Sequence, residues 1–293
     1  MLSFDIEKMH KLPPGARFFD LNDLWYFFNR WVIRILYPLP VTANQITFLS
    51  LLMGMAAAGF YLGGSENSLL WAAGFFYGKI VLDNVDGNLA RIRGEVSRLG
   101  RFFDSLTDFV VTFAVYGAIA FRLVRETSDP SFWGIGFLAL VSCFLQCSYY
   151  VFYLVNYTSR VGAYKMNRVR EDVTGKDRQA AARDKLSRRS LLLQRVYSGL
   201  YGWQDRVIEW QDRAAKKRAA VGEDPAEDKR WYLDKRFLTL VCPLCLCTNN
   251  MIVVVFSLFG RLDLGLLMVL VAGNSYLLAV QIWKIRRHGL RQR

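Results

Sequence analysis

Six long apolar segments constrain the fold of this chain more than any other feature. A helix that crosses a bilayer needs roughly 20 mostly apolar residues. The segments that meet or approach this length are Ile46–Leu62, Leu69–Leu82, Leu106–Phe121, Phe132–Tyr157, Phe237–Phe259 and Leu264–Trp283. The second and third reach it only if the polar residues at 83–86 and 104–108 belong to the helices. The sequence therefore predicts an all-α integral membrane protein with six transmembrane helices.

The basic residues predict how these helices are oriented. The net charge is +13, and the chain has 38 Lys and Arg residues. Of these, 34 lie in the termini and loops that the six segments place on the same side of the membrane. The other four are Lys79, Arg122, Arg125 and Arg261. Because cytoplasmic loops carry an excess of Lys and Arg, both termini are expected in the cytoplasm. We expect a multi-pass protein of a bacterial inner membrane or an equivalent membrane, and no nucleic-acid partner, since a membrane surface accounts for the charge.

The apolar segments divide the chain into four parts. These are a cytoplasmic and interfacial N-terminal segment at 1–40, helices one to four at 41–160, a long cytoplasmic insertion at 161–236, and helices five and six with a basic tail at 237–293.

Two polar stretches are expected at the cytoplasmic surface. Phe18–Leu36 mixes aromatic residues with arginines, as interfacial helices do. In the insertion, apolar residues from Leu193 to Trp210 recur at spacings of three and four, which predicts an amphipathic helix whose stripe lies on lipid or packs on a second subunit. Glu223–Lys229 is typical of a flexible linker. The insertion lacks paired carboxylates, so we expect it to be peripheral to any chemistry.

Four carboxylates form the candidate chemical centre. Asp83 and Asp86 are three residues apart at the end of the second segment, and Asp104 and Asp108 are four apart at the start of the third. Both spacings place a pair on one helical face, and the short loop between the segments lets the two faces converge. Such a cluster is costly at membrane depth unless it is compensated. An all-oxygen ligand set favours Mg²⁺, Mn²⁺ or Ca²⁺, and two such ions can clamp a phosphoryl centre.

The alternative is an acidic helix–loop–helix cap that is solvated or paired with the neighbouring arginines. A carboxylate at a helix start interacts favourably with the helix dipole, which accounts for Asp104. It does not account for Asp83 and Asp86, because these stand at the opposite end of a helix.

The fixed residues around the cluster resemble the signature of the CDP-alcohol phosphatidyltransferase family. In words, that signature is Asp, two residues, Asp-Gly, two residues, Ala-Arg, eight residues, Gly, three residues, Asp, three residues, Asp. Residues 83–108 meet every fixed position and every spacing. The six-helix layout with an interfacial N-terminal helix is similar as well, from about Phe18 to Trp283. The insertion is the main departure, since the family usually has a short loop there.

The resemblance implies transfer of a phosphoalcohol group from a CDP-alcohol to a second alcohol, with release of CMP. It implies one or two Mg²⁺ or Mn²⁺ ions, whose ligands would be Asp83, Asp86, Asp104 and Asp108. Asp108 would also be the catalytic general base on the acceptor hydroxyl. A homodimer in a lipid bilayer is implied by the family too.

The resemblance also implies contacts to the CDP-alcohol. Within the signature region these contacts are Gly87, Ala90, Arg91, Ser97 and Gly100. A Pro-Asn-x-x-Thr element of the family reads Ala43-Asn44-Gln-Ile-Thr47 here, without the proline. Asn44 and Thr47 are therefore further candidate donor contacts.

The acceptor is predicted from charge. A phosphorylated acceptor brings about two negative charges to a site that already holds four carboxylates, so cations must meet it. The candidates are Lys79, Arg93, Arg160 and Arg168. Lys79 shares a helical face with Asp83 and is expected chiefly to neutralise it. Asn249, Asn250 and Asn274 either line the acceptor cavity or form interhelical hydrogen bonds.

We expect CDP-diacylglycerol as donor and a small polyol phosphate as acceptor, with inositol phosphate ahead of glycerol phosphate. Serine or a neutral lipid alcohol is the alternative acceptor. Two readings of another class are a divalent-cation transporter and a catalytically silent membrane scaffold. Carboxylates at the cytoplasmic edge argue against the first, because transporter sites lie near the midplane, and an intact set of four aspartates argues against the second.

Overall fold

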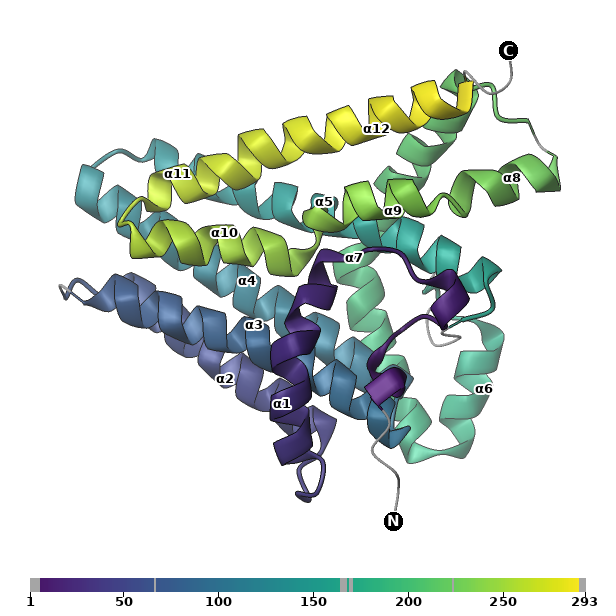
Figure 1. Ribbon diagram of the computed structural model, residues 1–293. Coiled ribbons are helices and arrows are strands. Elements are labelled where there is room, and N and C mark those ends of the chain that lie inside the picture. The colour runs from purple at the N-terminus through teal and green to yellow at the C-terminus, as the bar shows by residue number, and fades with distance from the viewer. Residues whose placement is uncertain (1–5, 66, 164–167, 169–170, 223, 290–293) are drawn as a thin grey trace. The chain divides into compact units, whose positions relative to one another are not determined.

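The computed structural model describes residues 6–65, 67–163, 168, 171–222 and 224–289. Every element in these residues is helical, which confirms the predicted all-α class (Figure 1). The chain forms two compact units, each built from separate stretches. The first comprises Met1–His10, Asn22–Cys143 and Leu246–Ala272. The second comprises Lys11–Leu21, Phe144–Cys245 and Gly273–Arg293.

The first unit contains the helices that carry the signature. Its elements are η1 (Ile6–Met9), α1 (Tyr26–Leu36), α2 (Ala43–Leu62), α3 (Ser68–Arg93), α4 (Arg98–Thr127), the first part of α5 (Ser131–Arg160), α10 (Leu246–Leu258) and α11 (Leu262–Leu267). A π-helical stretch, Met268–Gly273, follows α11.

The second unit contains the rest of α5 and most of the insertion. Its further elements are η2 (Pro14–Ala16), α6 (Gly175–Arg183), α7 (Lys185–Arg218), α8 (Pro225–Tyr232), α9 (Lys235–Val241), η4 (Cys242–Leu244) and α12 (Asn274–Gly289). The short helix η3 (Leu21–Trp25) begins where the two units meet in the sequence.

Five helical segments are long and apolar enough to cross a membrane, judged by length and composition. They are Ala43–Leu62, Arg98–Thr127, Ser131–Arg160, Pro225–Leu258 and Leu262–Gly289. These contain five of the six predicted spans. The second predicted span lies in α3, which is 26 residues long but carries charged side chains that lower its mean hydropathy. The residues of the candidate site are thus the reason that α3 does not qualify by composition.

The polar ends of the second and third segments do belong to helices. α3 continues through Asp83 and Asp86, and it ends at Gly94, whose φ of 70° is the left-handed conformation that favours glycine at a helix C-cap. α4 begins at its N-cap Ser97, whose Oγ accepts a hydrogen bond from the Gly100 amide at 3.1 Å. A loop of four residues, 94–97, therefore separates the two helices that carry the carboxylate pairs.

Helix α2 packs against both α3 and α4 (Figure 1). Its small residues allow close approach. The Ser50 hydroxyl donates to the Lys79 carbonyl of α3 at 3.1 Å, and a Cβ at Gly54 would overlap the Val111 side chain of α4. α2 thereby fixes the two helices that carry the aspartates.

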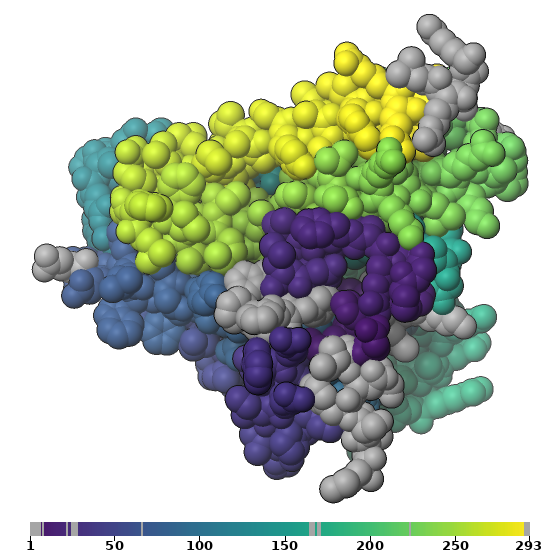
Figure 2. Space-filling view, viewed as in Figure 1, coloured from purple at the N-terminus to yellow at the C-terminus, as the bar shows by residue number. Residues whose placement is uncertain are grey.

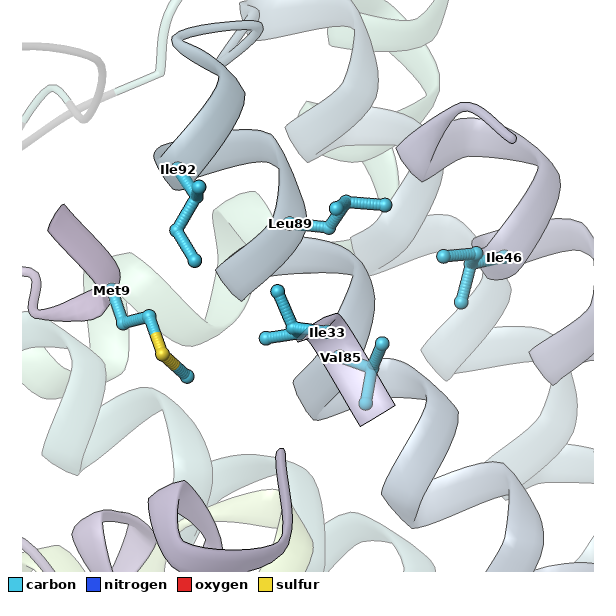
Figure 3. Close-up of a cluster of buried hydrophobic side chains, with 6 residues drawn as sticks. All are labelled: Met9, Ile33, Ile46, Val85, Leu89 and Ile92. Carbon is cyan, nitrogen blue, oxygen red and sulfur yellow. The ribbon is translucent and has the colours of Figure 1, made fainter. Parts of the chain in front are cut away.

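A buried apolar cluster attaches the N-terminal elements to α2 and α3. Its members are Met9, Ile33, Ile46, Val85, Leu89 and Ile92 (Figure 3). On the other side of α1, Trp31 and Ile35 are exposed. An interfacial helix requires an exposed apolar face of this kind. The location of α1 at the membrane interface stays a prediction.

Three expectations about regular structure need correction. The predicted linker at 223–229 is helical from Pro225, because Asp224 caps α8 and proline is well accommodated in its first turn; Glu223 lies outside the described residues. The fifth predicted span is interrupted by the short helix η4, which contains Pro243. The sixth is interrupted by the π-helical stretch before α12.

The predicted amphipathic helix of the insertion is α7. Its buried residues include the polar Gln204 and Asp212 beside Ile208, whereas Trp203 and Trp210 of the predicted apolar stripe are exposed. The exposed part of the stripe is therefore available to lipid or to a second subunit.

Asp212 of α7 is the centre of a buried network in the second unit. Its carboxylate accepts hydrogen bonds from Tyr153 Oη at 2.6 Å, Tyr232 Oη at 2.6 Å and Trp231 Nε1 at 2.8 Å. The buried ammonium of Lys284 lies 3.6 Å from the Tyr153 ring centre and 4.2 Å from that of Trp231. Cation–π contacts of this kind are stronger when water is excluded.

Asp212→Ala should therefore destabilise the protein by roughly 3–5 kcal/mol, because it leaves three buried donors without an acceptor. The measurement is thermal unfolding of the full chain in detergent. Asp172→Ala is the matched control, since it removes an exposed carboxylate from the same unit. Equal unfolding temperatures for the two variants would contradict a structural role for the network.

Candidate active site

Three of the four predicted aspartates converge in the first unit. Asp83 of α3 and Asp104 and Asp108 of α4 each offer one carboxylate oxygen, and these atoms lie within 4.8 Å of one another. The Oδ1 atom of Asp104 is buried and accepts no hydrogen bond within the described part of the chain, whereas the Oδ1 atom of Asp83 has the Lys79 ammonium 3.3 Å away. A buried carboxylate oxygen without a donor is costly, so this group is built to receive a cation.

Lys79 compensates part of the negative charge. Its buried Nζ donates to Asp108 Oδ1 and lies 3.3 Å from Asp83 Oδ1. The side chain is only 1% exposed, so the ammonium has exchanged its hydration for these carboxylates. The ion pair confirms that Lys79 neutralises Asp83, and it shows a second pairing, with Asp108, that helical spacing alone does not reveal.

Asp86 has a different environment. It is buried, and its Oδ2 lies 2.5 Å from Thr47 Oγ1 of α2, which donates to it. Asp86 does not belong to the group of three converging carboxylates. The structure thus joins two predicted site residues, Thr47 of α2 and Asp86 of α3. Asp86 as a metal ligand stays a prediction.

The three converging aspartates fit a hard divalent cation. Their donors are all oxygen, which suits Mg²⁺ or Mn²⁺ better than a soft metal. Three carboxylates against the single ammonium of Lys79 leave two formal negative charges, which one divalent ion balances. Asp83 and Asp104 each offer a carboxylate oxygen to the group and come from different helices, so one ion can be held by both.

Predicted donor contacts lie together beside the carboxylates. A Cβ at Gly100 would lie 3.2 Å from both Asn44 Oδ1 and Ser97 Oγ, so Asn44 of α2 meets the start of α4 there. A Cβ at Gly87 would meet only the Arg91 guanidinium, at 3.4 Å. The fold itself has room for a methyl group at Gly87, whereas Gly100 is closely surrounded.

Several of these residues also have structural partners that sequence patterns do not predict. The Arg91 Nε donates to the Met9 carbonyl at 2.7 Å, and its Nη2 donates to Asn88. The Ala90 carbonyl accepts from the Glu95 amide at 2.9 Å and so helps to end α3. The only sequence signal for the Arg91–Asn88 pair is the spacing of three residues on one helix.

Arg93, a predicted acceptor contact, is engaged with the backbone. Its guanidinium donates to the carbonyl of Val41 and to those of Leu36, Tyr37 and Leu39, the last three at 2.9, 2.9 and 2.7 Å. These bonds tie the end of α1 and the following loop to α3. A contact between Arg93 and an acceptor stays a prediction.

The other predicted acceptor cations belong to the second unit. Arg160 Nη2 donates to Asp228 at 2.7 Å, and Arg168 forms a two-pronged pair with Asp177 at 2.8 and 2.9 Å. Both arginines therefore have carboxylate partners within their own unit. Their expected contact with the acceptor stays a prediction.

The three asparagines of the last two predicted spans are expected either to line a cavity or to link helices. Asn274 of α12 accepts a hydrogen bond from Gln146 Nε2 of α5 at 3.2 Å, which favours the second alternative at that position. Asn249 and Asn250 are buried on α10, a helix that packs against α3.

Comparison with known proteins supports the resemblance seen in the motif. Residues 40–185, about half of the chain, match the sequence profile of the CDP-alcohol phosphatidyltransferase family. The chain belongs to this family. The match runs from α2 to the end of α6 and includes all four aspartates of the site. This CDP-alcohol phosphatidyltransferase family member therefore carries its carboxylates in the matched half.

Two curated relatives have names that describe an inositol phosphate lipid as the product. The chain is similar to a phosphatidylinositol phosphate synthase of Corynebacterium glutamicum, with 31% identity over 119 residues, 40% of this chain and 49% of that protein. It is also similar to an archaetidylinositol phosphate synthase of Pyrococcus horikoshii, with 33% identity over 114 residues, 38% of this chain and 55% of that protein.

The third relative is a bifunctional IPC transferase and DIPP synthase of Thermococcus kodakarensis, with 32% identity over 102 residues, 34% of this chain and 22% of that protein. The chain spans about half the length of the first two relatives that it matches.

Lys79→Met should make this phosphatidyltransferase family member more dependent on a divalent ion. Breaking a buried ion pair leaves Asp83 and Asp108 uncompensated, so the variant should lose roughly 3–5 kcal/mol of stability in EDTA. Addition of Mg²⁺ should then raise its unfolding temperature more than that of the wild type, because the ion replaces the missing charge.

The readout is thermal unfolding in detergent with EDTA or with Mg²⁺. Lys176→Met is the control, because Lys176 is exposed on α6. If the response to Mg²⁺ is the same in Lys79→Met, Lys79→Ala and wild type, the carboxylates near Lys79 do not hold the ion.

Proposed function

We propose that this chain transfers a phosphatidyl group from CDP-diacylglycerol to the hydroxyl of a small polyol phosphate and releases CMP. The observation that carries this proposal is the group of three carboxylates, in which the buried Asp104 Oδ1 has no donor among the described residues, set within a complete family signature. The names of two relatives, which form phosphatidylinositol phosphate and archaetidylinositol phosphate, support a polyol phosphate acceptor. Inositol phosphate is accordingly the first choice and glycerol phosphate the second.

Asp83, Asp86, Asp104 and Asp108 are the proposed metal ligands, for one or two Mg²⁺ or Mn²⁺ ions. When bound, the metal supplies positive charge to the pyrophosphate and to the departing phosphate. Asp86 would exchange its hydrogen bond from Thr47 for this role, or keep it and hold the metal through its other oxygen.

Asp108 is the proposed general base. An acceptor hydroxyl within hydrogen-bond reach of its carboxylate passes its proton to it. The acceptor oxygen then forms a bond to the phosphorus that carries the lipid alcohol, and the bond from that phosphorus to the phosphate of CMP breaks. Gly87, Ala90, Arg91, Ser97 and Gly100, with Asn44 and Thr47, bind the CDP part of the donor. The acceptor phosphate is met by the four cations named above from the sequence.

We further propose that the chain spans the membrane six times, with α3 as the additional span, and that both termini and the site face the cytoplasm. The distribution of basic residues supports this orientation. On the opposite side, Arg122 pairs with Glu126 at 2.7 Å and Arg261 with Asp263 at 2.9 Å, so two of the three basic residues there are neutralised. A homodimer is the proposed assembly.

The acceptor is identified by CMP release from CDP-diacylglycerol in the presence of Mg²⁺ or Mn²⁺, with each alcohol supplied separately. Inositol phosphate should support the fastest turnover, followed by glycerol phosphate, because the site is expected to provide cations for a phosphate group. An Asp104→Asn variant gives the background. Turnover with serine or diacylglycerol, together with failure of both polyol phosphates, would overturn the acceptor assignment.

Gly87→Ala should weaken CDP binding by about tenfold or more while leaving the unfolding temperature unchanged, because a methyl group there meets ligand and not the fold. Gly74→Ala in the same helix is the matched control, since nothing lies within 4 Å of its Cβ position. Calorimetric titration with CDP and Mg²⁺ measures both variants. A lower unfolding temperature with unchanged CDP affinity would show that Gly87 is required only by the fold.

A further inference from the structure

A concave pocket of about 650 Å³ lies in the second unit, between α8, the start of α9 and the end of α12. It is independent of the carboxylates of the signature, all of which belong to the first unit. The surfaces of α9 and α12 lie side by side in Figure 2. Five basic side chains and one acidic side chain contribute to the lining: Lys229, Arg230, Lys235, Arg236, Arg287 and Asp234.

The single carboxylate of this pocket is already engaged. Asp234 accepts from Arg287 Nε at 2.9 Å, and it caps α9 by accepting from the amides of Arg236 and Phe237 at 3.0 and 3.3 Å. His288 lies 3.6 Å from the same carboxylate. Asp234 therefore holds Arg287 in place and has little capacity to neutralise the other cations.

Three of the cations lack an acidic partner. Within the described residues, Lys229, Arg230 and Arg236 have no carboxylate at ion-pair distance, whereas Lys235 donates to the Gly15 carbonyl at 2.7 Å. Like charges gathered around one concavity repel each other. A multiply charged anion would relieve this repulsion and could be bound through two-pronged hydrogen bonds from the guanidinium groups.

The alternative is that these cations serve only the orientation of the helices, which requires basic residues at cytoplasmic ends. The orientation of helices in a membrane depends on the number of basic residues in a loop. It does not require that these residues line a pocket, or that a carboxylate holds one arginine in place as Asp234 holds Arg287. The pocket size falls in the range of small-molecule sites, about 300–1,000 Å³. These features favour a binding site.

The place of the pocket indicates the source of the anion. It lies at the basic ends of two segments that are apolar enough to span a membrane, Pro225–Leu258 and Leu262–Gly289. From the pocket, α12 continues with exposed apolar side chains, Leu278 and Ile282, on which an acyl chain can lie. Basic pockets at the ends of transmembrane helices suit phosphorylated lipid headgroups.

We propose that this pocket binds a phosphate-bearing anion, and that the anion is the headgroup of an anionic phospholipid. The shared chemistry is a phosphate group with at least one negative charge, which a soluble phosphate also provides. The proposal does not depend on the reaction proposed for the first unit, because it concerns binding by the second unit.

The test measures binding of three probes to the full chain in detergent. The probes are dihexanoyl phosphatidic acid, dihexanoyl phosphatidylcholine and inorganic phosphate. The pocket variant combines Lys229→Gln, Arg230→Gln and Arg236→Gln. Its matched control combines Arg178→Gln, Arg183→Gln and Arg188→Gln, which removes three exposed charges from α6 and α7 of the same unit.

Phosphatidic acid should bind the wild type and the control equally, and the pocket variant about tenfold or more weakly, because charge-assisted hydrogen bonds are lost. Phosphatidylcholine should bind all three proteins weakly and alike. If inorganic phosphate binds as tightly as phosphatidic acid with the same dependence on the pocket, the site stands and its ligand is a soluble phosphate. If neither anion binds, or if both variants weaken binding equally, the proposal is wrong.

A second measurement does not require the variant to fold. A photoreactive phosphatidic acid is crosslinked to the wild type, and the labelled peptides are identified. Labelling should concentrate at residues 226–236 and 287–288 and should be displaced by unlabelled phosphatidic acid. Uniform labelling of the apolar helices, without displacement, would overturn the proposal.

Discussion

The first unit depends on the ion pairs that Lys79 forms with Asp83 and Asp108. An isolated ionised group buried between apolar helices costs several kcal/mol, and a partner in good geometry offsets that cost. Lys79 stands one helical turn before Asp83 and reaches Asp108 on α4. The ion pairs of Lys79 offset part of the cost of burying these charges. Because one ammonium cannot balance three carboxylates, the compensation of charge in the site is incomplete. That incompleteness distinguishes a cation site from a purely structural salt bridge.

The surrounding contacts hold the carboxylates at this spacing. α2 binds α3 through Ser50 and approaches α4 at Gly54, so it fixes both carriers of the aspartates. Thr47 of the same helix engages Asp86. At the end of α3, Arg91 and Arg93 donate to backbone carbonyls of the N-terminal region. Residues of the signature therefore form hydrogen bonds within the fold in addition to their proposed contacts with the substrate. A ligand that binds Arg91 contacts a guanidinium that also donates to the Met9 carbonyl.

The spacing of the aspartates predicted the convergence of α3 and α4, because helical periodicity determines which residues share a face. Periodicity does not determine which neighbouring helix covers that face. The hydrogen bond from Thr47 to Asp86 and the carbonyl contacts of Arg93 depend on helix packing between distant parts of the chain. The fifth span is interrupted at Pro243, a position where a proline breaks the helix although the surrounding run is apolar. The helix at Pro225–Tyr232 was missed because its polar composition resembles that of a linker.

The expectation that the insertion is peripheral to chemistry stays a prediction, and the insertion contributes to the buried network of the second unit. Asp212 of α7 accepts hydrogen bonds from Tyr153 on α5 and from Trp231 and Tyr232 on α8. The ammonium of Lys284 on α12 is buried among the same rings. Without α7, these buried donors would lose their acceptor while the lysine kept its charge. The length of the insertion is thus a requirement of the second unit, since a short loop could not supply a buried carboxylate at this position.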